Sequence, residues 1–162
     1  MYAITRRLIK KDLQNFPDEV IESWLLPLAK EDGWPPIATT WNALLLEKPL
    51  QFWMAVVWRK QRIAFTRFNL HPRSFDAVVG IIQTNTRGLI NAYSNLRNTR
   101  KRFNDIIRYL RQHQMLPKPP VILSDGFLYR IADGNHRVAA YMYLQPSIGL
   151  ISQPECWVAS PP

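Results

Sequence analysis

Hydrophobic and polar residues form their clearest pattern between residues 116 and 144. Val121–Leu123 is a short apolar run, and residues 127–132 then alternate between two kinds of side chain, which predicts two strands. Asp125-Gly126 lies between them and is typical of a tight hairpin turn. From residue 136 to residue 144 no breaker interrupts the apolar residues, which predicts a buried helix.

A second clear pattern covers residues 100–113, where apolar residues recur at helical spacing. They predict an amphipathic helix whose buried face is formed by Phe103, Ile106, Ile107 and Leu110. Shorter patterns predict two more strands. We interpret Arg67–Leu70 as the first strand of the sheet and residues 155–159 as an edge strand near the C-terminus.

The N-terminal half has the spacing of short helices. A helix is predicted from Pro17 to Gly33, because proline suits a first helical turn and glycine an end, with a kink at Pro27. Residues 1–16 are interpreted as a basic arm or a short helix. Further helices are predicted at 40–47, at 52–64 and from Ser74 through Ile82. A strand at 52–58 is the alternative to the helix at 52–64. Residues 83–98 are predicted to form a loop with a short helix.

These patterns together predict the α+β class. A chain of 162 residues that is 47% hydrophobic is long enough for one sizeable core. We therefore expect a single domain over residues 1–162, with a mainly helical part, residues 1–96, packed on a small mixed sheet with helices, residues 97–160.

The net charge of +9 is concentrated in one segment, since residues 97–111 hold six basic residues and one acidic residue. A concentrated basic patch is typical of a protein that binds a polyanion, so DNA is a predicted partner. For Arg108 and Arg111 the alternative is that they complement the C-terminal end of the helix dipole. The predicted DNA contacts are Arg97, Arg100, Lys101, Arg102, Arg108 and Arg111.

A second basic cluster consists of Arg59, Lys60, Arg62 and Arg67. A solvated face and a polyanion contact explain it equally well.

The chemistry is expected where the second strand of the hairpin meets the following helix, at Asp133-Gly134-Asn135-His136-Arg137. The first turn of a helix attracts anions, and a glycine there lets a phosphate approach the backbone. Arginine adds a fork of donors suited to phosphate oxygens. The alternative is an N-cap aspartate, a turn glycine and two solvated side chains.

With these residues in place, the stretch from Arg97 to Trp157 resembles the core of the ParB/sulfiredoxin superfamily. Its members carry a Gly-x-x-Arg signature at this junction, which Gly134 and Arg137 match. Asn135 stands where sulfiredoxins carry a catalytic cysteine, so reductase chemistry is not expected. The short chain is similar to plasmid-borne, stand-alone members, including the Osa-type fertility-inhibition proteins.

The resemblance implies a nucleotide site, for ATP or another nucleoside triphosphate, at Gly134, Asn135, His136 and Arg137. It also implies nuclease and ATPase activity. Arg137 would then stabilise phosphate charge and His136 would act as the general acid or base. Asp133 would orient His136 or hold a divalent metal such as Mg²⁺. His71 and Arg73 are candidates for a loop that closes over the nucleotide.

Three hypotheses of function remain open from the sequence. The first is an enzyme that hydrolyses phosphodiester or phosphoanhydride bonds. The second is a nucleotide-dependent DNA-binding module without turnover. The third is an inhibitor that acts by protein–protein contact, for example against a DNA-transfer (type IV secretion) apparatus.

The remaining composition bears on location. Cys156 is the one cysteine, which excludes an intramolecular disulfide and fits a reducing cytoplasm. No apolar run reaches membrane-spanning length, so the protein is not expected to be transmembrane. Basic residues near the N-terminus are not followed by an uninterrupted apolar segment, so a signal peptide is not expected.

Overall fold

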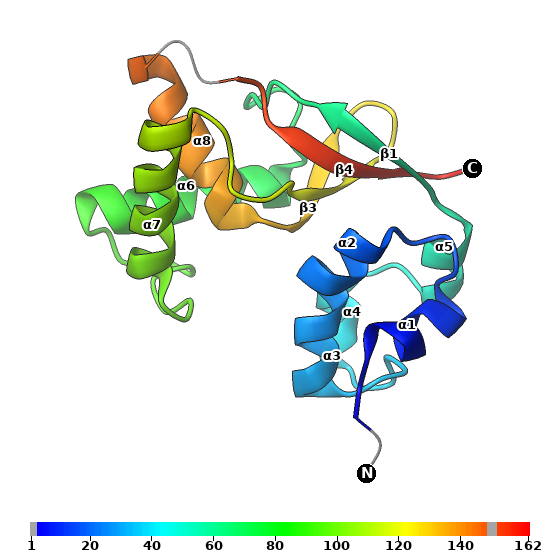
Figure 1. The fold of residues 1–162 in the computed structure, drawn as a ribbon. Helices are drawn as coiled ribbons and strands as arrows, with labels where there is room; N and C mark the ends of the chain where they lie inside the picture. The colour runs from blue at the N-terminus through cyan, green and yellow to red at the C-terminus, as the bar shows by residue number, and fades with distance from the viewer. Residues whose placement is uncertain (1–2, 149–151) are drawn as a thin grey trace.

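The computed structural model describes residues 3–148 and 152–162 and places the chain in the α+β class, as predicted (Figure 1). The N-terminal half is helical, with α1 Arg6–Asp12, α2 Asp18–Val20, the π-helix η1 Ile21–Leu25, α3 Leu26–Asp32, α4 Thr40–Leu44 and α5 Leu50–Ala55. The remaining elements are β1 Val57–Arg62, α6 Pro72–Arg87, α7 Thr99–His113, β2 Val121–Ser124, β3 Tyr129–Asp133, α8 Asn135–Ile148 and β4 Glu155–Ser160.

Within the described residues the strands form one mixed, four-stranded sheet in the order β1-β4-β2-β3. β4 runs antiparallel to β1 and parallel to β2, and β2 and β3 form the predicted antiparallel hairpin. The interpretation of residues 155–159 as an edge strand is wrong, because β1 pairs with β4 and moves it inside the sheet.

The sheet buries apolar side chains on both faces, because successive residues of a strand point to opposite sides. Ile122 and Val158 join the core made with α6, α7 and α8. Their neighbours Val121 and Ala159 join a separate core made with the N-terminal helices. The two groups of helices therefore pack against one shared sheet, and Figure 1 shows them as separate layers.

The segment after Pro49 differs from the prediction. The helix expected over residues 52–64 ends at Ala55, and the chain continues as β1. Val56 and Val57 favour an extended backbone, and the pairing partner of β1 lies about a hundred residues further along the chain, where no local pattern reveals it.

The strand expected at Arg67–Leu70 is also wrong. Residues 66–70 turn, with the amide of Asn69 donating to the carbonyl of Thr66, and Leu70 alone forms an isolated bridge to Tyr129.

The helix predicted between Pro17 and Gly33 exists as the continuous series α2, η1 and α3. The amide of Leu26 donates to the carbonyl of Ile21, five residues back, which is the bond of a π turn. Pro27 has no N–H, so this wider turn precedes it instead of a break. Gly33 ends the series at φ 86°.

The predicted helix at 40–47 stops at Leu44, because Leu46 and Glu47 adopt positive φ angles. α6 is longer than predicted and continues to Arg87 before Gly88 ends it in the left-handed region, so the first part of the loop expected at 83–98 is helical. α6 also begins two residues before the predicted start at Ser74, and His71 caps it by accepting from the amide of Arg73.

Candidate functional site

The junction has the strand–glycine–helix form that the sequence predicts. β3 ends at Asp133, and α8 begins at Asn135 with the amide of Val138 donating to the carbonyl of Gly134 over 3.0 Å. Gly134 has φ +106°, a conformation that residues with a Cβ rarely adopt. Glycine therefore suits the turn from β3 into α8.

Arg137 lies across Gly134 and is 12% exposed. One terminal nitrogen donates to Asp133 Oδ2 at 2.7 Å, and the other donates to the carbonyls of Lys118 and Pro119 at 3.2 and 3.1 Å. A Cβ on Gly134 would lie 2.9 Å from Arg137 Nη2, so the glycine also makes room for the guanidinium. The arginine fork thus ties α8 to the end of β3 and to the loop before β2.

His136 points away from this fork and is buried between α7 and α8, with 4% of its surface exposed. Its Nε2 lies 2.9 Å from the hydroxyl of Thr99, which also accepts from the side-chain amide of Asn85 at 3.0 Å. Burial, with a smaller contribution from the charge of Arg102, lowers the pKa of His136 to about 4. The imidazole is therefore neutral at pH 7 and links three helices through hydrogen bonds.

The structure accordingly divides the predicted site. Asp133, Gly134 and Arg137 lie together, whereas His136 belongs to the helix interface. Asn135 is half-buried at the start of α8, and the described residues offer its side chain no hydrogen-bond partner.

Metal binding at Asp133 does not fit this arrangement. The carboxylate is held by Arg137, and residues 3–148 and 152–162 contain no group of three or more His, Cys, Asp or Glu side chains that could hold a metal ion. Divalent ions in proteins usually need one or two carboxylates turned toward the ion. The terminal nitrogens of Arg137, which a nucleotide phosphate would need as donors, already donate to Asp133 and to two backbone carbonyls.

The basic face of α7 is the other predicted site, and it lies on the surface. The helix packs on α8 through Phe103, Ile107 and Leu110, which are buried. Asp105 is its single acidic residue and pairs with Lys101 at 2.5 Å and with Arg108 at 3.3 Å. The predicted DNA contacts are all exposed: Arg97, Arg100, Lys101, Arg102, Arg108 and Arg111.

Four of these side chains have no ion pair within the part of the chain that the structure describes: Arg97, Arg100, Arg102 and Arg111. The surface of α7 is therefore positively charged along its length. Lys101 and Arg108 share Asp105 as their partner. The hydrogen bond from Lys101, with smaller contributions from the charge of Lys101 and from Arg108, holds the pKa of the Asp105 carboxyl below its ordinary value.

His71 and Arg73 lie apart from the junction. His71 caps α6 and lines a small hollow with Lys48, Asp125 and Arg130. Arg73 and Arg130 both pair with Glu47, so this corner of the molecule is a cluster of ion pairs at the surface.

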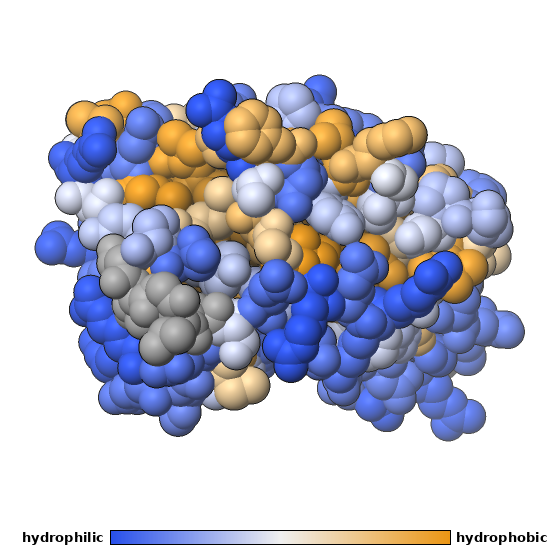
Figure 2. Space-filling view, turned by 90° about the horizontal axis from the view of Figure 1, so that it is seen from above, coloured by the Kyte–Doolittle hydropathy of each residue, from blue (hydrophilic) through white to orange (hydrophobic). Residues whose placement is uncertain are grey.

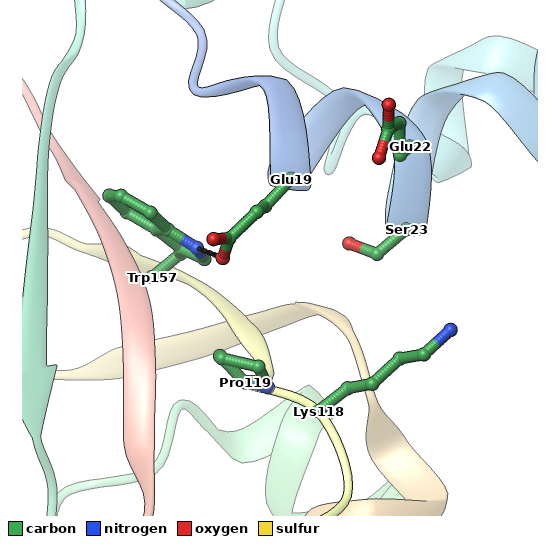
Figure 3. Close-up of a pocket in the computed structure, with 6 residues that line it drawn as sticks. All are labelled: Glu19, Glu22, Ser23, Lys118, Pro119 and Trp157. Atoms are coloured by element: carbon green, nitrogen blue, oxygen red, sulfur yellow. Dashed lines mark hydrogen bonds between the residues drawn. The ribbon is translucent and has the colours of Figure 1, made fainter.

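A further hollow of about 250 Å³ lies between η1 and the loop before β2 (Figure 3). Trp157 forms one wall and donates through its indole N–H to the Glu19 carboxylate at 2.9 Å. This hydrogen bond, with a smaller contribution from the charge of Lys60, lowers the pKa of the Glu19 carboxyl. Ser23 and Lys118 lie opposite. Lys118 and Pro119 are also the residues whose carbonyls hold Arg137.

Sequence reasoning missed the partners of the junction. No sequence signal marks Thr99 as the partner of His136, or Asn85 as the donor to Thr99, and backbone carbonyls such as that of Pro119 carry no signal at all. Cys156 is buried, and burial raises the pKa of its thiol to about 12, so it is not a nucleophile in the folded protein.

No family model, curated protein or solved structure matches this chain. Among the residues that the structure describes, no helix has the length and apolar character needed to cross a membrane.

Proposed function

We propose that the protein is a nucleic-acid-binding module that contacts phosphates with the basic face of α7. The observation that carries the proposal is the exposed row of arginines on this helix, four of them without an ion pair among the described residues. When such a surface neutralises the phosphates of a nucleic acid, the counterions condensed on the nucleic acid are released, which drives binding whatever the base sequence.

Helix stability does not explain where these charges lie. Arg100, Lys101 and Arg102 occupy the N-terminal turn, which has the positive end of the dipole and no acidic residue. Basic residues there reduce helix stability, whereas Arg111 in the last turn increases it. A phosphate bound beside the first turn would neutralise the charge and use the free backbone amides.

The proposal is for binding without turnover. A general acid or base must reach the proton it transfers, and His136 is buried, neutral and bonded to Thr99. Arg137 already donates to Asp133 and to two carbonyls. The nuclease and ATPase activities implied by the ParB/sulfiredoxin resemblance stay predictions, as do the nucleotide and the cytoplasmic location. An assay with nucleoside triphosphates and DNA, with and without Mg²⁺, tests the two activities.

The test of the binding proposal compares two alanine substitutions, each of which removes one positive charge. Arg100→Ala removes a charge from the face of α7, and Lys30→Ala removes one from an exposed position on α3. Fluorescence anisotropy with a labelled duplex should show several-fold weaker binding for Arg100→Ala and unchanged binding for Lys30→Ala. Equal affinities in the two variants, or no binding by the parent protein at low salt, would contradict the proposal.

A further inference from the structure

The two edges of the sheet are treated differently by the rest of the chain. At the β3 edge, the amide of Tyr129 donates to the carbonyl of Asn69, and the carbonyl of Tyr129 accepts from the amide of His71. The amide of Ile131 donates to the hydroxyl of Ser74. This edge is covered by the segment that leads into α6. β1 is the opposite edge, and the described residues provide no such cover for it.

The ladder shows which backbone groups of β1 are free. The amide of Ile63 donates to the carbonyl of Pro154 at 3.0 Å, in register with the β1–β4 pairs. Antiparallel strands alternate, so the amides and carbonyls of Trp58, Lys60 and Arg62 point away from β4. Within residues 3–148 and 152–162 no group bonds to them.

The edge is also accessible, since every residue of β1 except half-buried Trp58 is exposed. It spans the six residues Val57–Arg62, an ordinary strand length. Figure 2 looks down on the top of the molecule as drawn in Figure 1, where a band of apolar surface is bordered by hydrophilic side chains. An exposed edge of this length is a template for another strand.

The charge of β1 selects the kind of strand. Arg59 has no ion pair among the described residues, and Arg62 donates to the carbonyl of Gln153. Lys60 lies near Glu19 and Glu155, at 3.5 and 3.8 Å. A second copy of β1 would bring like charges opposite one another, which is destabilising. An acidic strand would instead find complementary charge.

We propose that the free edge of β1 binds an extended, acidic segment of a partner protein, which adds a strand to the sheet beside β1. Its backbone pairs with Trp58, Lys60 and Arg62. Arg59 and Arg62 lie on opposite faces of the sheet, so acidic side chains on one face of the added strand lie beside one of the two, according to its register. This surface is separate from the basic face of α7, so the two interactions are independent.

The test uses the full chain and a capped peptide that alternates threonine and glutamate, with an alternating threonine–lysine peptide as the charge control. Lys60→Pro removes the outward amide and leaves the bonds to β4 in place, because proline is tolerated where an edge N–H faces solvent. Lys60→Ala is the matched control for the lost side chain. Binding is measured by fluorescence anisotropy, and the site by amide chemical shifts.

The glutamate peptide should bind the parent protein and Lys60→Ala, and bind Lys60→Pro about tenfold more weakly. The lysine peptide should not bind. Equal affinity of Lys60→Pro and Lys60→Ala, or no binding at millimolar peptide, would overturn the proposal. So would dimerisation of the parent protein that Lys60→Pro abolishes, because the occupant would then be a second copy.

Should Lys60→Pro fail to fold, the parent protein and an N-methylated glutamate peptide decide the question. Methylation removes the peptide's donors toward β1 while keeping its charge. Weaker binding of the methylated peptide supports strand addition. Unchanged binding reduces the interaction to charge attraction and overturns the proposed pairing.

Discussion

At the scale of single residues, the junction between β3 and α8 is a structural connection. Gly134 at positive φ gives Arg137 its place, and Arg137 holds Asp133 and the carbonyls of Lys118 and Pro119. His136 joins α8 to α7 through Thr99. Chemically versatile residues in a helix's first turn are here used to fix the position of the helix.

Gly134→Ala should destabilise the protein more than Gly126→Ala. Both glycines have positive φ, +106° and +98°, so both alanines suffer a similar backbone strain. At Gly126 an added Cβ meets nothing within 4 Å, whereas at Gly134 it meets the Arg137 guanidinium at 2.9 Å. The guanidinium can move away from the added Cβ only by weakening its hydrogen bonds to Asp133 and to the two carbonyls, which should add about 1–3 kcal/mol to the loss, measured by urea unfolding. Equal losses in the two variants would show that Arg137 is not held over Gly134.

His136 should make stability depend on pH. Its pKa is lowered from 6.5 to about 4 in the folded protein, so the unfolded chain binds more protons between these values. Stability should therefore fall as the pH drops from 6.5 to 4, by on the order of 3 kcal/mol from this group. Urea unfolding of His136→Gln should lack this part of the pH dependence, while His113→Gln, an exposed control, should retain it. Identical pH profiles for His136→Gln and the parent protein would contradict the buried, neutral imidazole.

At the scale of elements, the sequence predicted α7, α8 and the β2–β3 hairpin because their patterns are local. The 3.6-residue period of Phe103 and Leu110 is visible without any partner. β1 was missed because most of its residues are exposed and polar, and its pairing with β4 crosses most of the chain. The same limit applies to the site, since its sequence positions were predictable but the acceptors of Arg137 and the burial of His136 depend on tertiary packing.

α7 offers a prediction in which stability and binding change in opposite directions. Arg100→Glu places an acidic residue in the first turn, where it should stabilise the helix by about 0.3–1 kcal/mol. The same change should weaken DNA binding more than Arg100→Ala does. Thermal unfolding and duplex affinity are measured together. Lys30→Glu, at an exposed position on α3, carries the same charge change and should leave DNA affinity unaltered. A variant that binds DNA as the parent does would remove Arg100 from the interface.

At the scale of the whole molecule, the sheet connects two cores. Val121 and Leu123 pack with the N-terminal helices, and Ile122 between them packs with α6, α7 and α8. Neither group of helices can leave the sheet without exposing apolar strand residues. If the chain is the single domain predicted from the sequence, both cores should unfold together, and an unfolding experiment measures this cooperativity directly.

We expect one cooperative unfolding transition. All six tryptophans lie in or against the core of the N-terminal helices, namely Trp24, Trp34, Trp41, Trp53, Trp58 and Trp157. Tryptophan fluorescence therefore reports on one core, whereas circular dichroism reports on all helices. The two signals should give the same midpoint in urea. An earlier fluorescence transition would show that the N-terminal helices unfold separately and that the chain has two domains.

The central claim is that phosphates bind along the face of α7, and the salt dependence of DNA affinity tests it most directly. Each phosphate contact contributes about −0.9 to the slope of log K against log salt concentration. The variant with Arg100, Arg102, Arg108 and Arg111 all replaced by alanine should have a slope less negative than the parent's by about 3 to 4. A parent slope near zero, or the same slope in both proteins, would contradict the claim.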